Sequence, residues 1–177
     1  SIPQEIEKDF LKISKDALLK ALTFVLFAVS IDETRPFLTG VLVIMKAEKV
    51  ILVATDGFRL SHKSLPLGIQ KQNLKAQRII IPKNVLSELS RLSGDDDFIN
   101  FTFKGQDNQV IFGTSNAILS SRIIDGEFPD FEKIIPKTPK LKIGLDREDF
   151  LRAGKLSGVF ARDSANVLKL SVEGNSL

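Results

Sequence analysis

Asp56 and His62 are the residues of this chain whose types could perform acid–base chemistry. They lie in the stretch "ATDGFRLSHKSLPL", residues 54–67, and His62 is the only histidine among 177 residues. Six residues of extended chain span about 20 Å, which separates a carboxylate from an imidazole that it would have to orient. The sequence contains no cysteine and no serine-centred nucleophile motif. We therefore predict that the chain is not an enzyme and that His62 is a solvated side chain.

Metal and phosphate sites are the next chemistry to consider. The acidic run "GDDD", residues 94–97, follows an expected helix without any further ligand pattern, which is typical of a solvated loop. The stretch "KGQDNQ", residues 104–109, is not a phosphate-binding loop, and no Walker pattern occurs elsewhere. The absence of cysteine excludes disulfides and thiolate metal sites and fits a reducing compartment. We predict no cofactor, no metal and a cytoplasmic location.

The overall composition is that of a soluble globular protein with a weak preference for polyanions. The chain has 25 basic and 22 acidic side chains, a net charge of +3, so a single strongly basic patch is not expected. Its most apolar run, "ALTFVLFAV" at residues 21–29, is shorter than the roughly 20 residues that cross a bilayer. We interpret this run as a buried helix, not as a membrane segment.

A strand–helix pattern occurs three times along the chain. The three copies are "ISKDALLKAL" at 13–22, "IPKNVLSELS" at 81–90 and "LDREDFLRAG" at 145–154, so they start 68 and 64 residues apart. Ser14 and Asp146 are good N-cap residues, and Pro82 suits the first turn of a helix. A recurrent unit of this length predicts an internally repeated fold.

Strand patterns follow each expected helix. After the first two helices, alternating or continuous apolar runs are joined by turns at "KAEK", 46–49, and "KGQDN", 104–108. The unit therefore reads βαβββ, an α+β fold with helices on one face of antiparallel sheets. We expect one complete two-unit domain over 1–140 and the front half of another, a strand, a helix and a hairpin, over 141–177. The segment "PKTPK", 136–140, is a linker signal between the two. Such a half-domain would be marginal alone, so either its sister unit lies beyond residue 177 in a longer chain, which we expect, or it packs on the first domain.

Three motifs resemble one family. "RPFLTGVLV" at 35–43, "VATDGFRL" at 53–60 and "IIDGEFPDFEKIIPK" at 123–137 occur in the order and spacing of the bacterial sliding clamps, the beta subunits of DNA polymerase III. The resemblance implies a DNA-clamp fold with two βαβββ units per domain and three domains per protomer. It places 1–140 at the middle domain and 141–177 at the first half of the C-terminal domain. It also implies a non-catalytic processivity factor whose two protomers close a ring around duplex DNA.

The resemblance further implies a hydrophobic pocket for short linear peptides of polymerase and clamp-loader subunits. Phe58 stands where the family often has His, and Lys133 where it often has Arg. Taken singly, each apolar member of this set is more simply explained by core packing. The alternative function is a clamp-like domain that binds a partner peptide without encircling DNA. The expected pocket residues are Leu38, Thr55, Gly57, Phe58, Arg59, Leu60, Pro129, Lys133 and Ile134.

Duplex DNA is the other partner that the resemblance implies, held through its phosphates without sequence reading. Thr23 and Ser30 would continue a polar stripe along the first helix, and ordinary solvated charge is the alternative for every residue of the set. We expect a homodimer for the full-length parent and a monomer for this chain. The expected DNA-facing residues are Lys15, Lys20, Arg35, Lys83, Asn84, Arg91, Arg147 and Arg152.

Overall fold

The structure is a computed structural model that describes residues 10–46, 48–67, 77–91, 95–105, 107–138, 141–162 and 167–173. The chain divides into two compact units, Ser1–Glu132 and Lys133–Leu177, which are described separately below. Among the described residues, none of the helices combines the length and the apolar character that crossing a membrane would require.

The first unit contains two βαβββ repeats, which confirms the predicted α+β fold. The first repeat comprises β1 (Leu11–Ser14), α1 (Lys15–Val25), β2 (Gly40–Lys46), β3 (Lys49–Thr55) and β4 (Leu60–Pro66). The second comprises β5 (Gln77–Pro82), α2 (Lys83–Leu89), β6 (Phe98–Lys104), β7 (Gln109–Gly113) and β8 (Ile118–Arg122). Short 3-10 helices η1 (Leu26–Ala28) and η2 (Pro36–Leu38) connect α1 to β2, and α3 (Phe131–Ile134) follows β8. The predicted cap forms at α1, where Ser14 Oγ accepts a hydrogen bond from the Ala17 amide at 3.4 Å.

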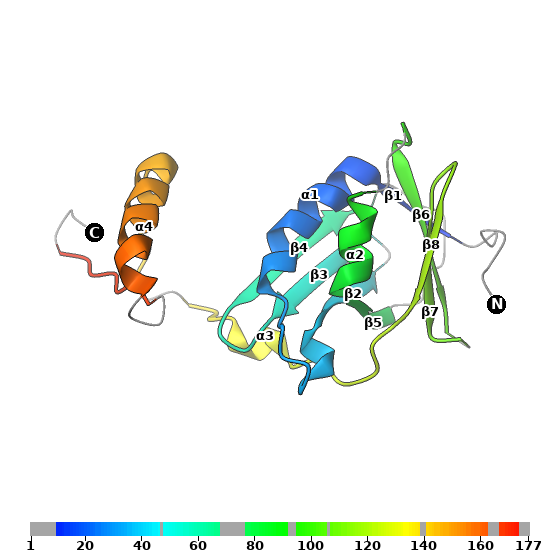
Figure 1. The fold of residues 1–177 in the computed structure, drawn as a ribbon, viewed down its shortest axis with the longest axis horizontal. Coiled ribbons are helices and arrows are strands. Elements are labelled where there is room, and N and C mark those ends of the chain that lie inside the picture. Colours follow the sequence, from blue (N-terminus) through cyan, green and yellow to red (C-terminus); the bar gives the residue numbers. More distant parts are fainter. Residues whose placement is uncertain are drawn as a thin grey trace. The chain divides into compact units, whose positions relative to one another are not determined.

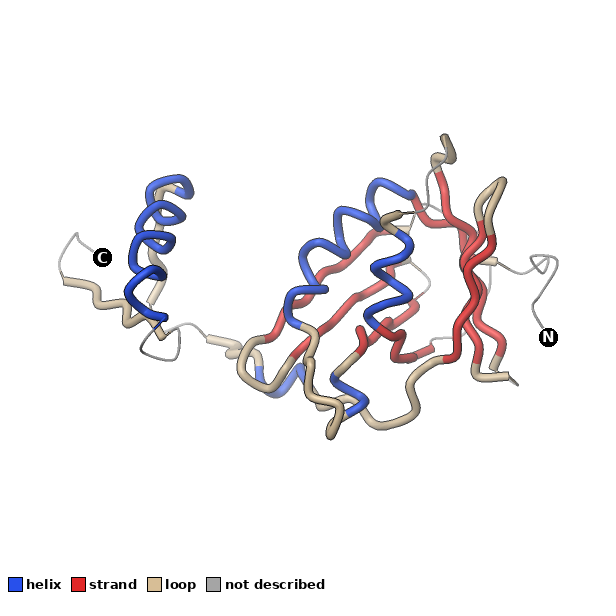
Figure 2. The backbone as a smooth tube through the Cα atoms, in the orientation of Figure 1, coloured by secondary structure: helices blue, strands red, loops and turns tan. Residues whose placement is uncertain are grey.

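Each repeat gives its first strand to the sheet of the other repeat. One antiparallel sheet has the order β4-β3-β2-β5, and the other has the order β1-β6-β7-β8. Figure 1 shows α1 and α2 lying over the first of these sheets, with the second sheet seen nearly edge-on, and Figure 2 shows the same arrangement by element type. Since β1 pairs only with the second repeat and β5 pairs with β2 of the first, neither sheet is complete without both repeats.

The two central strands of the first sheet, β2 and β3, are buried on both faces, which explains their unbroken apolar runs. On one face, alternate residues such as Val43 and Leu52 join α1, α2 and the second sheet in the main core. On the other face, Leu42 and Val53 belong to a smaller apolar cluster that also contains Leu38, Ile44, Ile51, Ile80, Phe128 and Phe131. We call this second group the outer cluster, and the site described below is built on it.

The run at residues 21–29 is only partly the buried helix that the sequence predicted. Leu22, Val25 and Ala28 are fully buried, but α1 ends at Val25 and the side chains of Phe24 and Phe27 are 47% and 57% exposed. A helix that rests on one sheet buries one stripe, and an apolar run longer than that stripe must expose the rest.

The second unit contains α4 (Arg147–Ala161), capped by Asp146, whose Oδ1 accepts hydrogen bonds at 2.9 Å from the amides of Glu148 and Asp149. The strands predicted before and after this helix are wrong for the described residues, because 141–146 and 167–172 are not in strands. Within the first unit, the first strand of each repeat pairs with the other repeat. The described residues of the second unit contain no other repeat with which such a strand could pair. Its apolar side chains are correspondingly exposed, as in Leu156 at 63% and Phe160 at 83%.

Candidate functional site

The turn between β3 and β4 is held by its own side chains. Thr55 and Leu60 are paired across the ladder, and Thr55 is only 5% exposed. Thr55 Oγ1 donates a hydrogen bond to the Arg59 carbonyl at 2.7 Å and accepts one from the Gly57 amide at 3.1 Å. Thr55, a predicted pocket residue, is therefore buried below the turn and fixes the shape of the turn through its hydroxyl.

Asp56 completes this network with its carboxylate. Oδ1 accepts hydrogen bonds from the amides of Phe58 at 2.9 Å and Arg59 at 3.0 Å, and Oδ2 lies 2.9 Å from Nε of Arg59. Partial burial raises the pKa of Asp56, but the two amides and the Arg59 guanidinium together outweigh it, so this pKa lies below its usual value. The carboxylate is thus ionised as a structural clamp and is not poised to accept a proton near neutral pH.

Gly57 is needed for its backbone conformation, with a φ of +94°. A Cβ at this position would lie 3.2 Å from a terminal nitrogen of Arg35, so the loop before β2 lies directly beside the turn. Arg35 Nε is 3.2 Å from Oδ2 of Asp32, an exposed pair. The pKa of Asp32 is lowered chiefly by a hydrogen bond from the Thr34 hydroxyl. Arg35, predicted to face DNA, is thereby a neighbour of the predicted peptide pocket.

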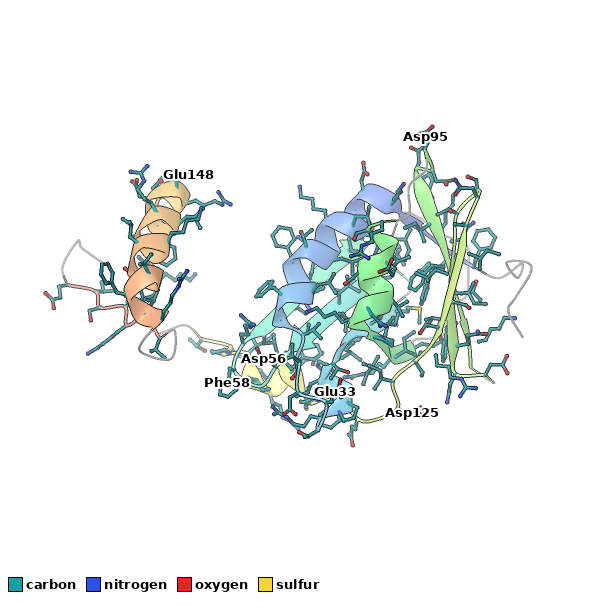
Figure 3. All side chains as sticks on the ribbon, viewed as in Figure 1. Glu33, Asp56, Phe58, Asp95, Asp125 and Glu148 are labelled. Carbon is teal, nitrogen blue, oxygen red and sulfur yellow. The ribbon has the colours of Figure 1, made fainter. Side chains whose placement is uncertain are left out.

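Two side chains project from this fixed turn. Phe58 is 97% exposed, and Figure 3 shows it at the edge of the first unit beside Asp56. Arg59 extends its guanidinium over the ring of Phe27, 5.7 Å from the ring centroid, in a cation–π contact. Leu60 is half-buried against the outer cluster, and Leu38 lies inside that cluster at 3% exposure. The turn therefore presents an aromatic ring and a cation above an apolar base.

The remaining predicted pocket residues lie further along the chain. Pro129 is half-buried between Phe128 and Asp130, which precede α3. Lys133 and Ile134 belong to the second unit and are both exposed, Ile134 at 61%. Of the predicted pocket, only Lys133 and Ile134 fall outside the first unit. The first unit contains Leu38, Thr55, Gly57, Phe58, Arg59, Leu60 and Pro129.

Sequence reasoning missed two aromatic residues next to the turn, Phe24 near the end of α1 and Phe27 in η1. Phe27 contacts Arg59, and Phe24 lies under Lys63 Nζ, which is 5.0 Å from its ring centroid. The Ser61 hydroxyl donates a hydrogen bond to the Phe24 carbonyl, which ties β4 to the helix. Their positions in the sequence could have revealed them. When the helical spacing of the buried residues of α1 is continued past Val25, Phe24 and Phe27 both fall outside the buried stripe.

The residues considered for catalysis or metal binding are engaged structurally. His62 is exposed and lies 5.9 Å, centroid to centroid, from the ring of Phe131. Asp96 of the acidic run accepts hydrogen bonds from the amide of Ser115, at 3.2 Å, and from its hydroxyl, at 3.0 Å. Within the part of the chain that the structure describes, no three His, Cys, Asp or Glu side chains are grouped so that they could hold a metal ion.

The residues predicted to face DNA lie on several elements. Lys15 and Lys20 are on α1, Lys83 and Asn84 open α2, and Asn84 uses its Oδ1 to accept a hydrogen bond from the Val85 amide. Ser30 does not continue a polar stripe on α1, because it is buried at 6% exposure and its hydroxyl accepts a hydrogen bond from the Asp32 amide. The four arginines of the set lie in ion pairs with nearby carboxylates: Arg35 with Asp32, Arg91 with Glu88, Arg147 with Glu148 and Arg152 with Asp149.

Known proteins resemble this chain over nearly its whole length. A family profile described as "DNA polymerase III beta subunit, central domain" matches residues 12–130. The beta sliding clamp of Staphylococcus epidermidis is 35% identical over 99% of this chain and 46% of its own length, and that of Staphylococcus aureus is 33% identical over 96% and 44%. The crystal structure of a DNA polymerase sliding clamp from Bacillus subtilis matches with a TM-score of 0.83 and 31% identity, over 92% of this chain and 42% of that chain. The chain thus spans less than half the length of these relatives.

Replacement of Asp56 by Asn tests the clamp within the turn. The amide side chain keeps an acceptor for the backbone but loses the charge that attracts Arg59, so Asp56→Asn should lower the free energy of unfolding at pH 7 by about 1 kcal/mol. Because the folded pKa is depressed, this contribution is complete above the unfolded pKa of about 3.9 and disappears as the pH falls through the folded pKa.

Urea denaturation at pH 7 and again at successive pH values below 4 measures the difference. Glu33→Gln is the control, since Glu33 is exposed and makes no ion pair or side-chain hydrogen bond within the described residues. A difference between Asp56→Asn and the parent chain that stays constant down to pH 2 would show that the charge of Asp56 does not stabilise the turn.

Proposed function

We propose that this chain, which belongs to the DNA polymerase III beta subunit family, forms part of a sliding clamp that docks partner proteins at the turn between β3 and β4. The clamp is a processivity factor without catalytic activity of its own, and the chemistry belongs to the polymerase. Its protomers close a ring around duplex DNA. Residues 1–140 form the middle domain and 141–177 the first half of the C-terminal domain.

The exposure of Phe58 carries this proposal. Thr55 and Asp56 accept hydrogen bonds from the three amides of the turn, those of Gly57, Phe58 and Arg59, while the ring of Phe58 is 97% exposed. An exposed aromatic residue on a fixed turn can bury its ring against a partner without first paying the ordering cost of a mobile loop. Arg59 and Leu60 flank it with a cation and an apolar base, the combination that suits a peptide with apolar anchors and an acidic or carboxyl-terminal group.

The affinity of such a site follows from its size. Burying two or three apolar anchors contributes roughly 1.5–3 kcal/mol each before ordering costs, so a dissociation constant on the order of micromolar is expected. Partners include polymerase and clamp-loader subunits that carry short linear motifs. A modest affinity at each site allows them to exchange.

DNA is held loosely in this proposal. The four arginines assigned to face it already pair with carboxylates, so the net charge that each ion pair presents to a phosphate is close to zero. Exposed ion pairs are worth about 0.2–1 kcal/mol and exchange readily for phosphate contacts. Such contacts position a duplex without reading its sequence, and retention on DNA then depends on closure of the ring.

Peptide titration tests the docking turn. A fluorescein-labelled peptide with leucine and phenylalanine anchors should bind the chain saturably, and Phe58→Ala, Arg59→Ala and Leu60→Asp should each weaken binding, Phe58→Ala by about tenfold. Fluorescence anisotropy measures the affinity. Phe98→Ala is the matched control, because Phe98 is a half-exposed phenylalanine on β6.

Phe58→Ala makes this test independent of folding, since a fully exposed ring contributes no core packing. Binding that Phe58→Ala leaves unchanged, or that Phe98→Ala weakens equally, would contradict docking at this turn.

Salt-dependent DNA binding tests the second partner. Two 20-base-pair duplexes of unrelated sequence should bind this chain equally at low salt. The double variant Lys20→Ala, Lys83→Ala should reduce the slope of log affinity against log salt concentration by about 1.8, at roughly 0.9 for each phosphate contact. The control Lys46→Ala, Lys49→Ala removes the same charge from the turn between β2 and β3.

An equal loss of slope in both double variants would mean that only net charge matters. A sequence-dependent affinity would contradict phosphate-only contact. If the chain binds the peptide but no duplex at low salt, it is a clamp-like docking domain without a DNA-encircling role.

A further inference from the structure

A groove lies at the other edge of the first sheet, between β5 and the segment that leads from β8 to α3. Its volume is about 640 Å³, within the range of roughly 300–1,000 Å³ that is usual for binding pockets. In Figure 3 the label Asp125 marks this segment, where the chain leaves β8. The lining of the groove includes Leu42, Arg78, Ile80, Glu127, Phe128 and Glu132.

The floor of the groove is apolar and its rim is acidic. Leu42, Ile80 and Phe128, all less than 10% exposed, belong to the outer cluster and form the floor. The rim carries three exposed carboxylates, Glu127, Asp130 and Glu132, against the single guanidinium of Arg78. The rim of the groove is therefore acidic although the chain as a whole has a net charge of +3.

The outer edge of β5 adds two backbone groups to the groove, the amide and the carbonyl of Arg78. β5 is the last strand of its sheet, and Ile80 meets Ile124 in an isolated bridge in which the Ile124 amide donates to the Ile80 carbonyl at 2.8 Å. Backbone groups of alternate residues in a strand point to the same side, so the amide and carbonyl of Arg78 also point away from β2. Among the described residues, the amide and the carbonyl of Arg78 have no hydrogen-bond partner on that side. An added strand could continue from the bridge along Arg78.

The groove is separate from the docking turn. It shares no residue with the predicted peptide pocket, and β4 and β5 are the opposite edges of the sheet. Three strand spacings of about 4.8 Å put these edges roughly 14 Å apart. The two sites can therefore be tested independently.

We propose that this groove docks a short extended segment of a partner protein in which lysine or arginine alternates with apolar residues. The apolar side chains would enter the floor, the cations would meet Glu127 and Glu132 at the rim, and the backbone would extend β5 by strand addition. Charge complementarity selects this occupant over nucleic acid, which Glu127 and Glu132 repel, and over acidic peptides of the kind that suit Arg59.

Binding of a defined peptide tests the proposal. The probe is a fluorescein-labelled, acetylated heptapeptide of alternating lysine and valine, titrated into the whole chain at low salt. The double variant Glu127→Gln, Glu132→Gln should weaken its binding at least fivefold, while Glu33→Gln, Glu48→Gln, which removes the same charge from exposed positions elsewhere, should not. N-methylation of alternate peptide amides should also weaken binding at least fivefold, because it removes the donors that face β5.

Amide chemical shifts locate the peptide. Arg78 and Ile80 should shift on titration, and Phe58→Ala should leave the affinity unchanged, which separates this proposal from the function of the docking turn. Equal losses in the two double variants, an unaffected N-methylated peptide, or shifts confined to other elements would overturn it. Self-association of the chain that Glu127→Gln, Glu132→Gln abolishes would identify a second copy as the occupant and would also overturn it.

Discussion

The exchange of first strands between the two repeats is the constraint on which the rest of this structure depends. β1 completes the sheet of the second repeat, and β5 completes the sheet of the first. Each repeat alone would leave a three-stranded sheet with an open edge and an uncovered apolar face. The main core accordingly contains residues of both helices and both sheets. The second unit is consistent with this dependence on a partner repeat. Its single repeat has a capped helix, but its described residues form no strand.

The docking turn follows from this arrangement. Because β2 and β3 are buried on both faces, the end of β3 is held in place at Thr55, and the turn begins from a fixed point. Thr55 and Asp56 then hold the backbone of the turn by hydrogen bonds, and the ring of Phe58 projects from it at 97% exposure. The groove at β5 depends on the same sheet, because its floor is the outer cluster that also supports Leu60. The two proposed docking sites thus lie at opposite edges of one sheet whose central strands, β2 and β3, are buried on both faces.

The sequence predicts the local features of this fold well and its long-range pairing poorly. Ser14 and Asp146 cap helices as expected, and the strands around the two predicted turns are present, because caps, turns and apolar alternation depend on neighbouring residues. The strand exchange has no local signal, since β1 reads the same whichever sheet receives it. The exposure of Phe24 and Phe27 depends on which stripe of α1 the sheet covers. The groove at β5 depends on the distant segment after β8, so no single motif reveals it.

Native-state hydrogen exchange of the first unit is the measurement that tests strand exchange most directly. The amide of Ile13 points toward β6, because the amide of Lys15, two residues further along, donates to the Asp97 carbonyl. The amide of Ile79 points toward β2, because the backbone of the next residue, Ile80, faces Ile124 on the opposite side. Both amides should exchange with the same opening free energy and denaturant dependence as amides of β3 and β7, since the two repeats unfold together. A repeat whose amides open at a distinctly lower free energy than those of its sister would contradict this account.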